Sequence, residues 1–131
     1  MNLYSRMLAG AGLAALAGLS AFAMPAQAQT YPTRSITVIV PFAAGGPTDV
    51  IARIVTGHMA QTLGQSIIIE NVVGAGGTTA STRAARAAND GYTLITGHMG
   101  THAASVPLYP NLAYHPEKSF EPVGLLAGTP S

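Results

Sequence analysis

The chain has 131 residues, of which 48 % are hydrophobic and 8 % charged, and its six basic and five acidic residues give a formal net charge of +1. This length suits one small domain or one lobe of a larger protein, and the near-neutral charge provides no basic surface for nucleic acid. The chain has no cysteine, which excludes a disulfide framework, a thiolate nucleophile and a cysteine-based zinc site.

The N-terminal segment has the organisation of a secretory signal peptide. Arg6 precedes an uncharged run over residues 7–24, and Ala26-Gln27-Ala28 forms an A-x-A cleavage site. A transmembrane anchor is the alternative reading, but glycines dilute the apolar run and Pro25 stands before the small residues. We therefore predict that residues 1–28 are a signal peptide, cleaved after Ala28, and that the mature chain is periplasmic.

Short β-branched runs alternate with helical patterns in the mature chain. Strands are predicted over 35–41, 66–72 and 92–96. A helix ending at Leu63 is predicted after the first glycine-rich turn, with Thr48 or Asp49 as its N-cap. Its expected apolar stripe comprises Ile51, Ile54, Val55, Met59 and Leu63, with Arg53, Thr56 and Gln61 pointing away and His58 partly buried within the stripe.

A second helix is predicted from the second glycine-rich turn to about Ala88, with a face of alanines that can lie close to a sheet. Residues 97–109 are expected to form a loop or short helix, and residues 110–131 a connection that can include a fourth strand. The resulting α/β unit is a parallel βαβαβ sheet with the first strand in the centre.

Both turns that lead from a strand into a helix are rich in glycine. Gly45 and Gly46 precede the first helix, and Gly74, Gly76 and Gly77 precede the second. Helix N-termini and free amides at the carboxyl ends of parallel strands favour an anion. The alternative is that these glycines only make tight turns and close helix packing.

The type of anion is narrowed by the motifs that are missing. The turns match neither G-x-G-x-x-G nor a Walker sequence, and the one lysine, Lys118, lies in the tail. A carboxylate held by amides and by the hydroxyls of Thr48, Thr78 and Thr101 fits better than a phosphate.

The charged and aromatic residues near these turns have structural readings as well. Asp49 is expected to cap the helix rather than touch a carboxylate ligand, and Arg53 to pair with Asp49 at i,i+4. Phe42 belongs either to the core or to a stack on the ligand. His98 and His102 are four residues apart, but no third ligand is nearby, so neither a metal nor another cofactor is expected.

The sequence closely resembles the Bug-type receptors, the periplasmic solute-binding proteins of tripartite tricarboxylate transporters. The resemblance runs from about Tyr31 onward and rests on the joint spacing of several motifs. These are Val40-Pro41-Phe42, Gly45-Gly46-x-Thr48-Asp49, Ala52-Arg53, Leu63-Gly64-Gln65, Glu70-Asn71, Gly74-Ala75-Gly76-Gly77, Asp90-Gly91-Tyr92-Thr93-Leu94 and Gly100-Thr101-His102-Ala103. The chain has Ala44 and Ser119 where the family usually has proline and aspartate.

This resemblance implies a two-lobed periplasmic binding protein of the type II, venus-flytrap fold, which closes on a small carboxylate and delivers it to a membrane permease. Residues 29–109 would be the α/β portion of the first lobe and 110–131 a connection towards a second lobe, which is absent. The ligand would be a di- or tricarboxylate, an amino acid or an aromatic acid. The implied ligand-binding residues are Phe42, Gly45, Gly46, Thr48, Asp49, Ala75, Gly76, Gly77, Thr78, Thr101 and His102.

Two other hypotheses stay open on the sequence alone. One is a small exported hydrolase or phosphate-handling enzyme with His98 or His102 as general base, although no ordered nucleophile, histidine and acid set is present. The other is a truncated product without function. A receptor without enzymatic activity is the prediction we favour.

Overall fold

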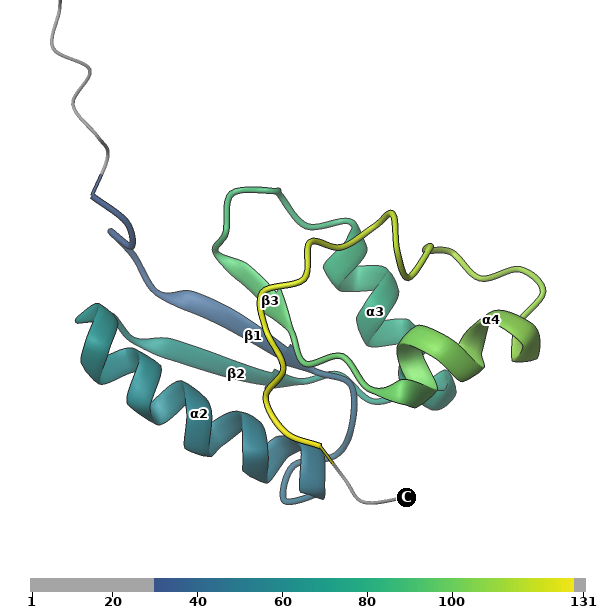
Figure 1. Cartoon of the computed structure of the whole chain (residues 1–131), viewed down its shortest axis with the longest axis horizontal. Coiled ribbons are helices and arrows are strands. Elements are labelled where there is room, and N and C mark those ends of the chain that lie inside the picture. Colours follow the sequence, from purple (N-terminus) through teal and green to yellow (C-terminus); the bar gives the residue numbers. More distant parts are fainter. Residues whose placement is uncertain (1–29, 129–131) are drawn as a thin grey trace, which may run out of the picture. The chain divides into compact units, whose positions relative to one another are not determined.

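A parallel sheet with the strand order β2-β1-β3 organises residues 30–128, the part of the chain that the computed structural model describes (Figure 1). Strand β1 spans Ile36–Val40, β2 spans Ile67–Asn71 and β3 spans Thr93–Ile95. The predicted strands, their parallel pairing and the central place of the first strand are confirmed. The predicted signal peptide and its cleavage site lie outside the described residues.

Two helices connect the strands and cover opposite faces of the sheet. Helix α2, Pro47–Leu63, joins β1 to β2, and helix α3, Thr78–Ala85, joins β2 to β3 (Figure 1). The connection from β1 to β2 runs in one direction along the sheet, and the connection from β2 to β3 runs back in the other. Because both crossovers are right-handed, their helices lie on opposite faces of the sheet. Burial follows this arrangement, because Ile36, Ile39 and Val40 of the central strand are each at most 1 % exposed.

The start of α2 differs from the prediction. Its N-cap is Gly46, and Pro47 occupies the first helical turn, so neither Thr48 nor Asp49 is the N-cap. Proline suits this position because its fixed φ is helical and its missing N–H would have no partner there. The helix ends at Leu63, and the C-cap residue Gly64 adopts a left-handed conformation with φ of 65°.

The buried face of α2 also differs from the predicted stripe. Asp49, Ala52 and Thr56, which share one side of the helix, are buried, whereas Ile54 is 59 % exposed and His58 is exposed. The small Ala52 side chain lets the helix approach the sheet closely, and Asp49 turns inward to polar partners. The predictions for Ile54, Thr56 and His58 were wrong because they weighted side-chain hydropathy above size and hydrogen bonding.

Helix α3 is shorter than predicted. A tight turn over Ala75–Gly77 precedes it, and it ends at Ala85 rather than near Ala88. The amides of Arg86 and Ala87 donate to carbonyls three residues earlier, at 3.2 and 3.1 Å, so the last turn tightens before the chain leaves the helix.

After β3 the chain forms a π-helical turn over Gly100–Ala104 and a short helix α4 over Ser105–Leu108. This agrees with the short-helix alternative for residues 97–109. The possible fourth strand is wrong for residues 110–128, where the chain is irregular. This segment is anchored instead by Tyr114, which is 6 % exposed and donates its hydroxyl proton to the Thr101 carbonyl.

Within residues 30–128, the structure has no helix with both the length and the apolar character needed to cross a membrane.

Candidate functional site

Three loops meet at the carboxyl edge of the sheet: the first, residues 41–46, follows β1, the second, residues 72–77, follows β2, and the third, residues 96–104, follows β3. Gly77 of the second loop lies so close to the other two that a Cβ placed on it would be 3.1 Å from the Pro41 Cβ and 2.5 Å from the Thr101 Cγ2. The Phe42 ring meets the His98 ring edge to face, with 5.3 Å between their centroids. Glycine is therefore required at position 77 for these loops to approach each other.

In the first loop, residues 41–46, the two amides nearest to α2 have acceptors. The Gly45 amide donates to the Asp49 Oδ2 at 2.8 Å, and the Gly46 amide donates to the Ala43 carbonyl at 3.2 Å. Val50 donates back to the Gly46 carbonyl, and Pro47 has no N–H. Within the described part of the chain, the amides of the half-buried Thr48 and the buried Asp49 are first-turn donors without an acceptor.

Asp49 is the centre of a buried polar cluster beneath this loop. Its side chain is 2 % exposed and accepts hydrogen bonds from the Arg53 Nε at 2.8 Å, from the Gly45 amide and from the Asn71 Nδ2 at 2.9 Å. These donors, with Arg53 contributing most, hold the pKa of the Asp49 carboxyl far below its usual range. The predicted i,i+4 pair is confirmed, and Asp49 braces the loop rather than capping the helix.

Asn71 is a residue that the sequence reasoning missed. Its Nδ2 donates to the Phe42 carbonyl and to the Asp49 Oδ1, both at 2.9 Å, and its Oδ1 accepts from the Arg53 Nη2 at 3.2 Å. A signal was present, because Asn71 lies near the end of the predicted strand 66–72 and three residues before the second glycine-rich turn. Polar residues at that place in adjacent parallel strands share one edge of the sheet.

The second loop has a run of left-handed backbone. Ala75, Gly76 and Gly77 have φ values of 44°, 63° and 90°. Ala75 is the unusual member, because a residue with a Cβ is strained in this region, and such strain clusters at functional sites.

Some hydrogen-bond donors of the second loop have acceptors within the protein, and others have none. The Gly77 amide donates to the Gly74 carbonyl, and the amide and the hydroxyl of Thr78 both donate to the Ala75 carbonyl. Among residues 30–128 no acceptor pairs with the exposed Ala75 and Gly76 amides. The free donors of the second loop thus include the Ala75 and Gly76 amides, which directly precede α3 along the chain.

The third loop is held by internal hydrogen bonds. The Thr101 side chain is buried, and its hydroxyl donates to the His98 carbonyl and accepts from the His98 amide, both at 3.0 Å. The same oxygen is 2.7 Å from the His102 Nδ1. The predicted role of the Thr101 hydroxyl as a ligand donor therefore competes with these contacts.

Each of the two histidines has its ring Nδ1 engaged within the third loop. The His98 Nδ1 accepts from the Gly100 amide at 3.0 Å, and the half-buried His102 packs against Phe120, with 4.9 Å between ring centroids. Burial lowers the pKa of His102. The hydroxyl beside the His102 ring is that of Thr101, whose side chain is buried. Within the described residues no three His, Cys, Asp or Glu side chains group as metal ligands.

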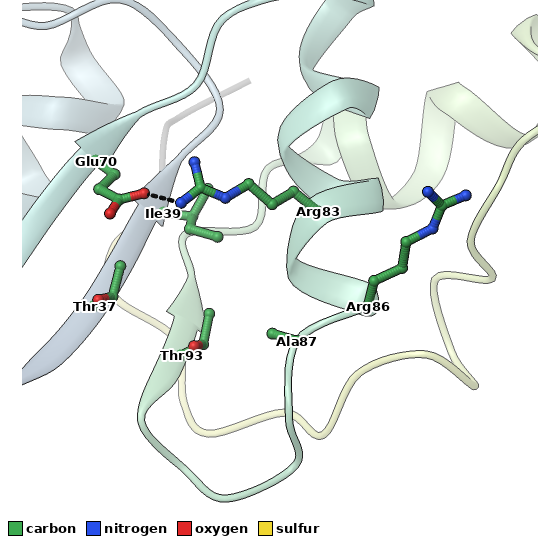
Figure 2. A pocket seen from close by; sticks show the side chains of 7 residues that line it. All are labelled: Thr37, Ile39, Glu70, Arg83, Arg86, Ala87 and Thr93. Atoms are coloured by element: carbon green, nitrogen blue, oxygen red, sulfur yellow. Dashed lines mark hydrogen bonds and ion pairs between the residues drawn. The ribbon is translucent and has the colours of Figure 1, made fainter.

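A hollow of about 290 Å³ lies elsewhere, between the sheet and α3 (Figure 2). Thr37, Ile39 and Thr93 form its floor on the sheet. Figure 2 shows Arg83 reaching across to an ion pair with Glu70, while the Arg86 guanidinium points away. Because none of the predicted ligand-binding residues lines it, this hollow is separate from the three-loop site.

The sequence model of the "Tripartite tricarboxylate transporter family receptor" matches residues 51–131. The chain belongs to this family. Among curated relatives, it is 38 % identical to protein BugT of Bordetella pertussis over 132 residues, which cover 99 % of this chain and 39 % of BugT. The chain spans about a third of the length of the curated relatives it matches.

Solved structures agree with this assignment. MatC from Rhodopseudomonas palustris with bound malate is 64 % identical and matches with a TM-score of 0.71 over 73 % of this chain and 33 % of MatC. Another R. palustris protein, solved with adipate, is 39 % identical with a TM-score of 0.64 over 66 % of this chain and 29 % of that one. The chain thus has the α/β fold found in a portion of these binding proteins.

Proposed function

We propose that the chain supplies one wall of a periplasmic receptor site for a small carboxylate, with a dicarboxylate such as malate as the first candidate. The observation that carries this proposal is that two helices begin at the carboxyl edge of the sheet, where the amides of Thr48, Ala75 and Gly76 have no acceptor among the described residues. The relatives solved with malate and adipate support the same ligand class.

The charges around the site favour recognition by amides over recognition by a salt bridge. The nearest cation, Arg53, is already paired with Asp49 at 2.8 Å. Backbone donors at a helix N-terminus stabilise an anion without any free cation, and each hydrogen bond to a charged group contributes about 1.5–3 kcal/mol in a closed site. The remaining predicted contacts, including Phe42, Thr78 and His102, stay predictions.

The proposed transport role includes two further parts. A second lobe would close over the exposed side of the ligand, as expected for a receptor whose relatives are about three times as long. A membrane permease of the tripartite type would receive the ligand. Family membership supports both parts of this role. The signal peptide would be cleaved after Ala28 in the course of export.

Ligand-observed NMR of malate with the exported chain tests the proposed function. We expect line broadening that disappears in a Gly76→Val variant, because a Cβ there would lie 2.9 Å from the Tyr109 hydroxyl and displace the loop that carries the free amides. Gly64→Val is the matched control, since φ is 63° at Gly76 and 65° at Gly64, and a Cβ at Gly64 meets nothing within 4 Å. Equal broadening in both variants, or equal broadening with a diamine in place of malate, would reject the proposal.

A further inference from the structure

One side chain at the end of β2 ties the first loop to the helix that follows it. The two protons of the Asn71 amide are shared between the Phe42 carbonyl, at the start of the loop, and the Asp49 carboxylate, one turn into α2. Asp49 in turn accepts from the Gly45 amide near the end of the loop. Both halves of the loop are thus fixed to the end of the neighbouring strand.

We propose that Asn71 is a positioning residue of the carboxylate site. It holds the first loop in the conformation that presents the Thr48 amide beside the second loop. This inference rests on the proposed function. Its distinctive element is that Asn71 acts through the loop and not through contact with the ligand.

The geometry explains why an amide is needed at this position. Asn71 must donate twice, to a carbonyl and to a carboxylate, while accepting from the Arg53 Nη2 at 3.2 Å. Aspartate has nearly the same shape but only accepts when ionised, so it would face both the Phe42 carbonyl and the Asp49 carboxylate without a proton to share. Leucine would remove all three contacts.

The malate affinity of an Asn71→Asp variant, measured at two pH values, distinguishes a positioning role of Asn71 from a purely structural one. At pH 7 two carboxylates meet at the cluster, and we expect malate affinity to fall about tenfold. At lower pH one of these two carboxylates takes up a proton and becomes a hydrogen-bond donor to the other. The hydrogen bond between the two side chains is then restored, so malate affinity relative to the unmodified chain should recover.

The pH comparison needs the other charged groups near the cluster to be controlled. Arg53 and Asp49 face Asn71 from α2, and His98 packs against Phe42 from the third loop. Expressing each affinity as a ratio to the unmodified chain at the same pH removes the titration of malate and of every group that the two chains share. Asn89→Asp, at an exposed position, is the matched control and should leave the ratio unchanged.

A second readout separates this inference from the proposed function. Hydrogen exchange of the Gly45 amide, measured without ligand, should accelerate in Asn71→Asp and in Asn71→Ala but not in Asn89→Asp. If the unmodified chain fails to bind malate while this exchange accelerates, the proposed function fails and the loop-fixing contact stands.

The inference is overturned if malate affinity in Asn71→Ala stays within about twofold of the unmodified chain. It is also overturned if Asn71→Asp loses affinity equally at both pH values. Unfolding of both variants would contradict it as well, because Asn71 would then be a residue of the fold rather than of the loop.

Discussion

At the scale of single residues, the site is built around a carboxylate that belongs to the protein. Asp49 lies at the N-terminus of α2, where a ligand carboxylate would also be stabilised, and its three donors hold it there in ionised form. Its pairing with Arg53 leaves this part of the site close to neutral. A ligand carboxylate therefore meets backbone dipoles rather than an unpaired charge.

The lowered pKa of Asp49 predicts a contribution to stability that depends on pH. A carboxyl whose pKa is lower in the folded chain stabilises it above the pKa of the unfolded chain, and this stabilisation is lost as the pH falls. The unmodified chain should therefore lose thermal stability between about pH 5 and pH 2. Asp49→Asn should show a shallower loss, measured by circular dichroism melting, and an unchanged slope would contradict this account.

The Arg83 and Glu70 ion pair beside the hollow of Figure 2 should matter much less. Their side chains are 55 % and 36 % exposed, so solvent screens the interaction. We expect Glu70→Gln to change the free energy of unfolding by less than about 1 kcal/mol and malate binding not at all. A larger loss of stability, or a loss of binding, in chemical denaturation and titration experiments would show that the hollow contributes to the site.

The residues that could be predicted from the sequence are those with local partners. Asp49 and Arg53 are one helical turn apart, so their pairing followed from spacing alone. Asn71 and Phe42 are far apart in the chain, and their contact depends on strand pairing that residue spacing does not show. The internal use of the Gly45 amide was missed for a related reason, since it requires the Asp49 side chain to turn back toward the loop.

At the scale of elements, close approach between loops decides which glycines are indispensable. Gly77 has φ of 90° and leaves no space for a Cβ against Thr101 and Pro41. Gly57 lies inside α2, is exposed, and a Cβ there would meet nothing within 4 Å. The same chemical change should therefore have opposite effects at these two positions.

Gly77→Ala should lower the free energy of unfolding by roughly 2–4 kcal/mol, from overpacking together with left-handed strain. Gly57→Ala should raise it by about 0.5–1 kcal/mol, because alanine loses less backbone entropy in a helix. Urea unfolding of the two variants checks both signs. A stabilising effect at Gly77 would mean that the three loops do not meet as described.

The positions of the strands and helices were largely predictable from the sequence, whereas the side of α2 that is buried was not. Each strand lies within its predicted range because β-branched residues and flanking turns mark it locally. The buried side of α2 follows from its partners on the sheet, which favoured Thr56 over Ile54. The turn at Gly100–Ala104 depends on buried contacts of Thr101, which no local periodicity records.

At the scale of the whole molecule, the described residues cover one face of the sheet better than the other. On the α3 side, Ile68 is 50 % exposed beside Thr37, its partner in the register. Parallel sheets are usually covered on both faces. The site likewise has one wall, formed by the loops at the carboxyl edge.

A one-walled site predicts weak binding by the exported chain, residues 29–131. Solvent weakens each hydrogen bond to the ligand, and association itself costs several kcal/mol. We expect a Kd for malate of about 1 mM or weaker. Isothermal titration of the exported chain that gave micromolar affinity would show that a second wall is unnecessary.

The central claim is that free backbone amides at two helix N-termini bind the carboxylate, and backbone amide chemical shifts of the ¹⁵N-labelled chain test it most directly. During titration with malate, the largest shifts should occur at Thr48, Ala75 and Gly76, with little change at Arg83 and Arg86. Shifts centred on Arg83 and Arg86, beside the hollow of Figure 2, would contradict the claim.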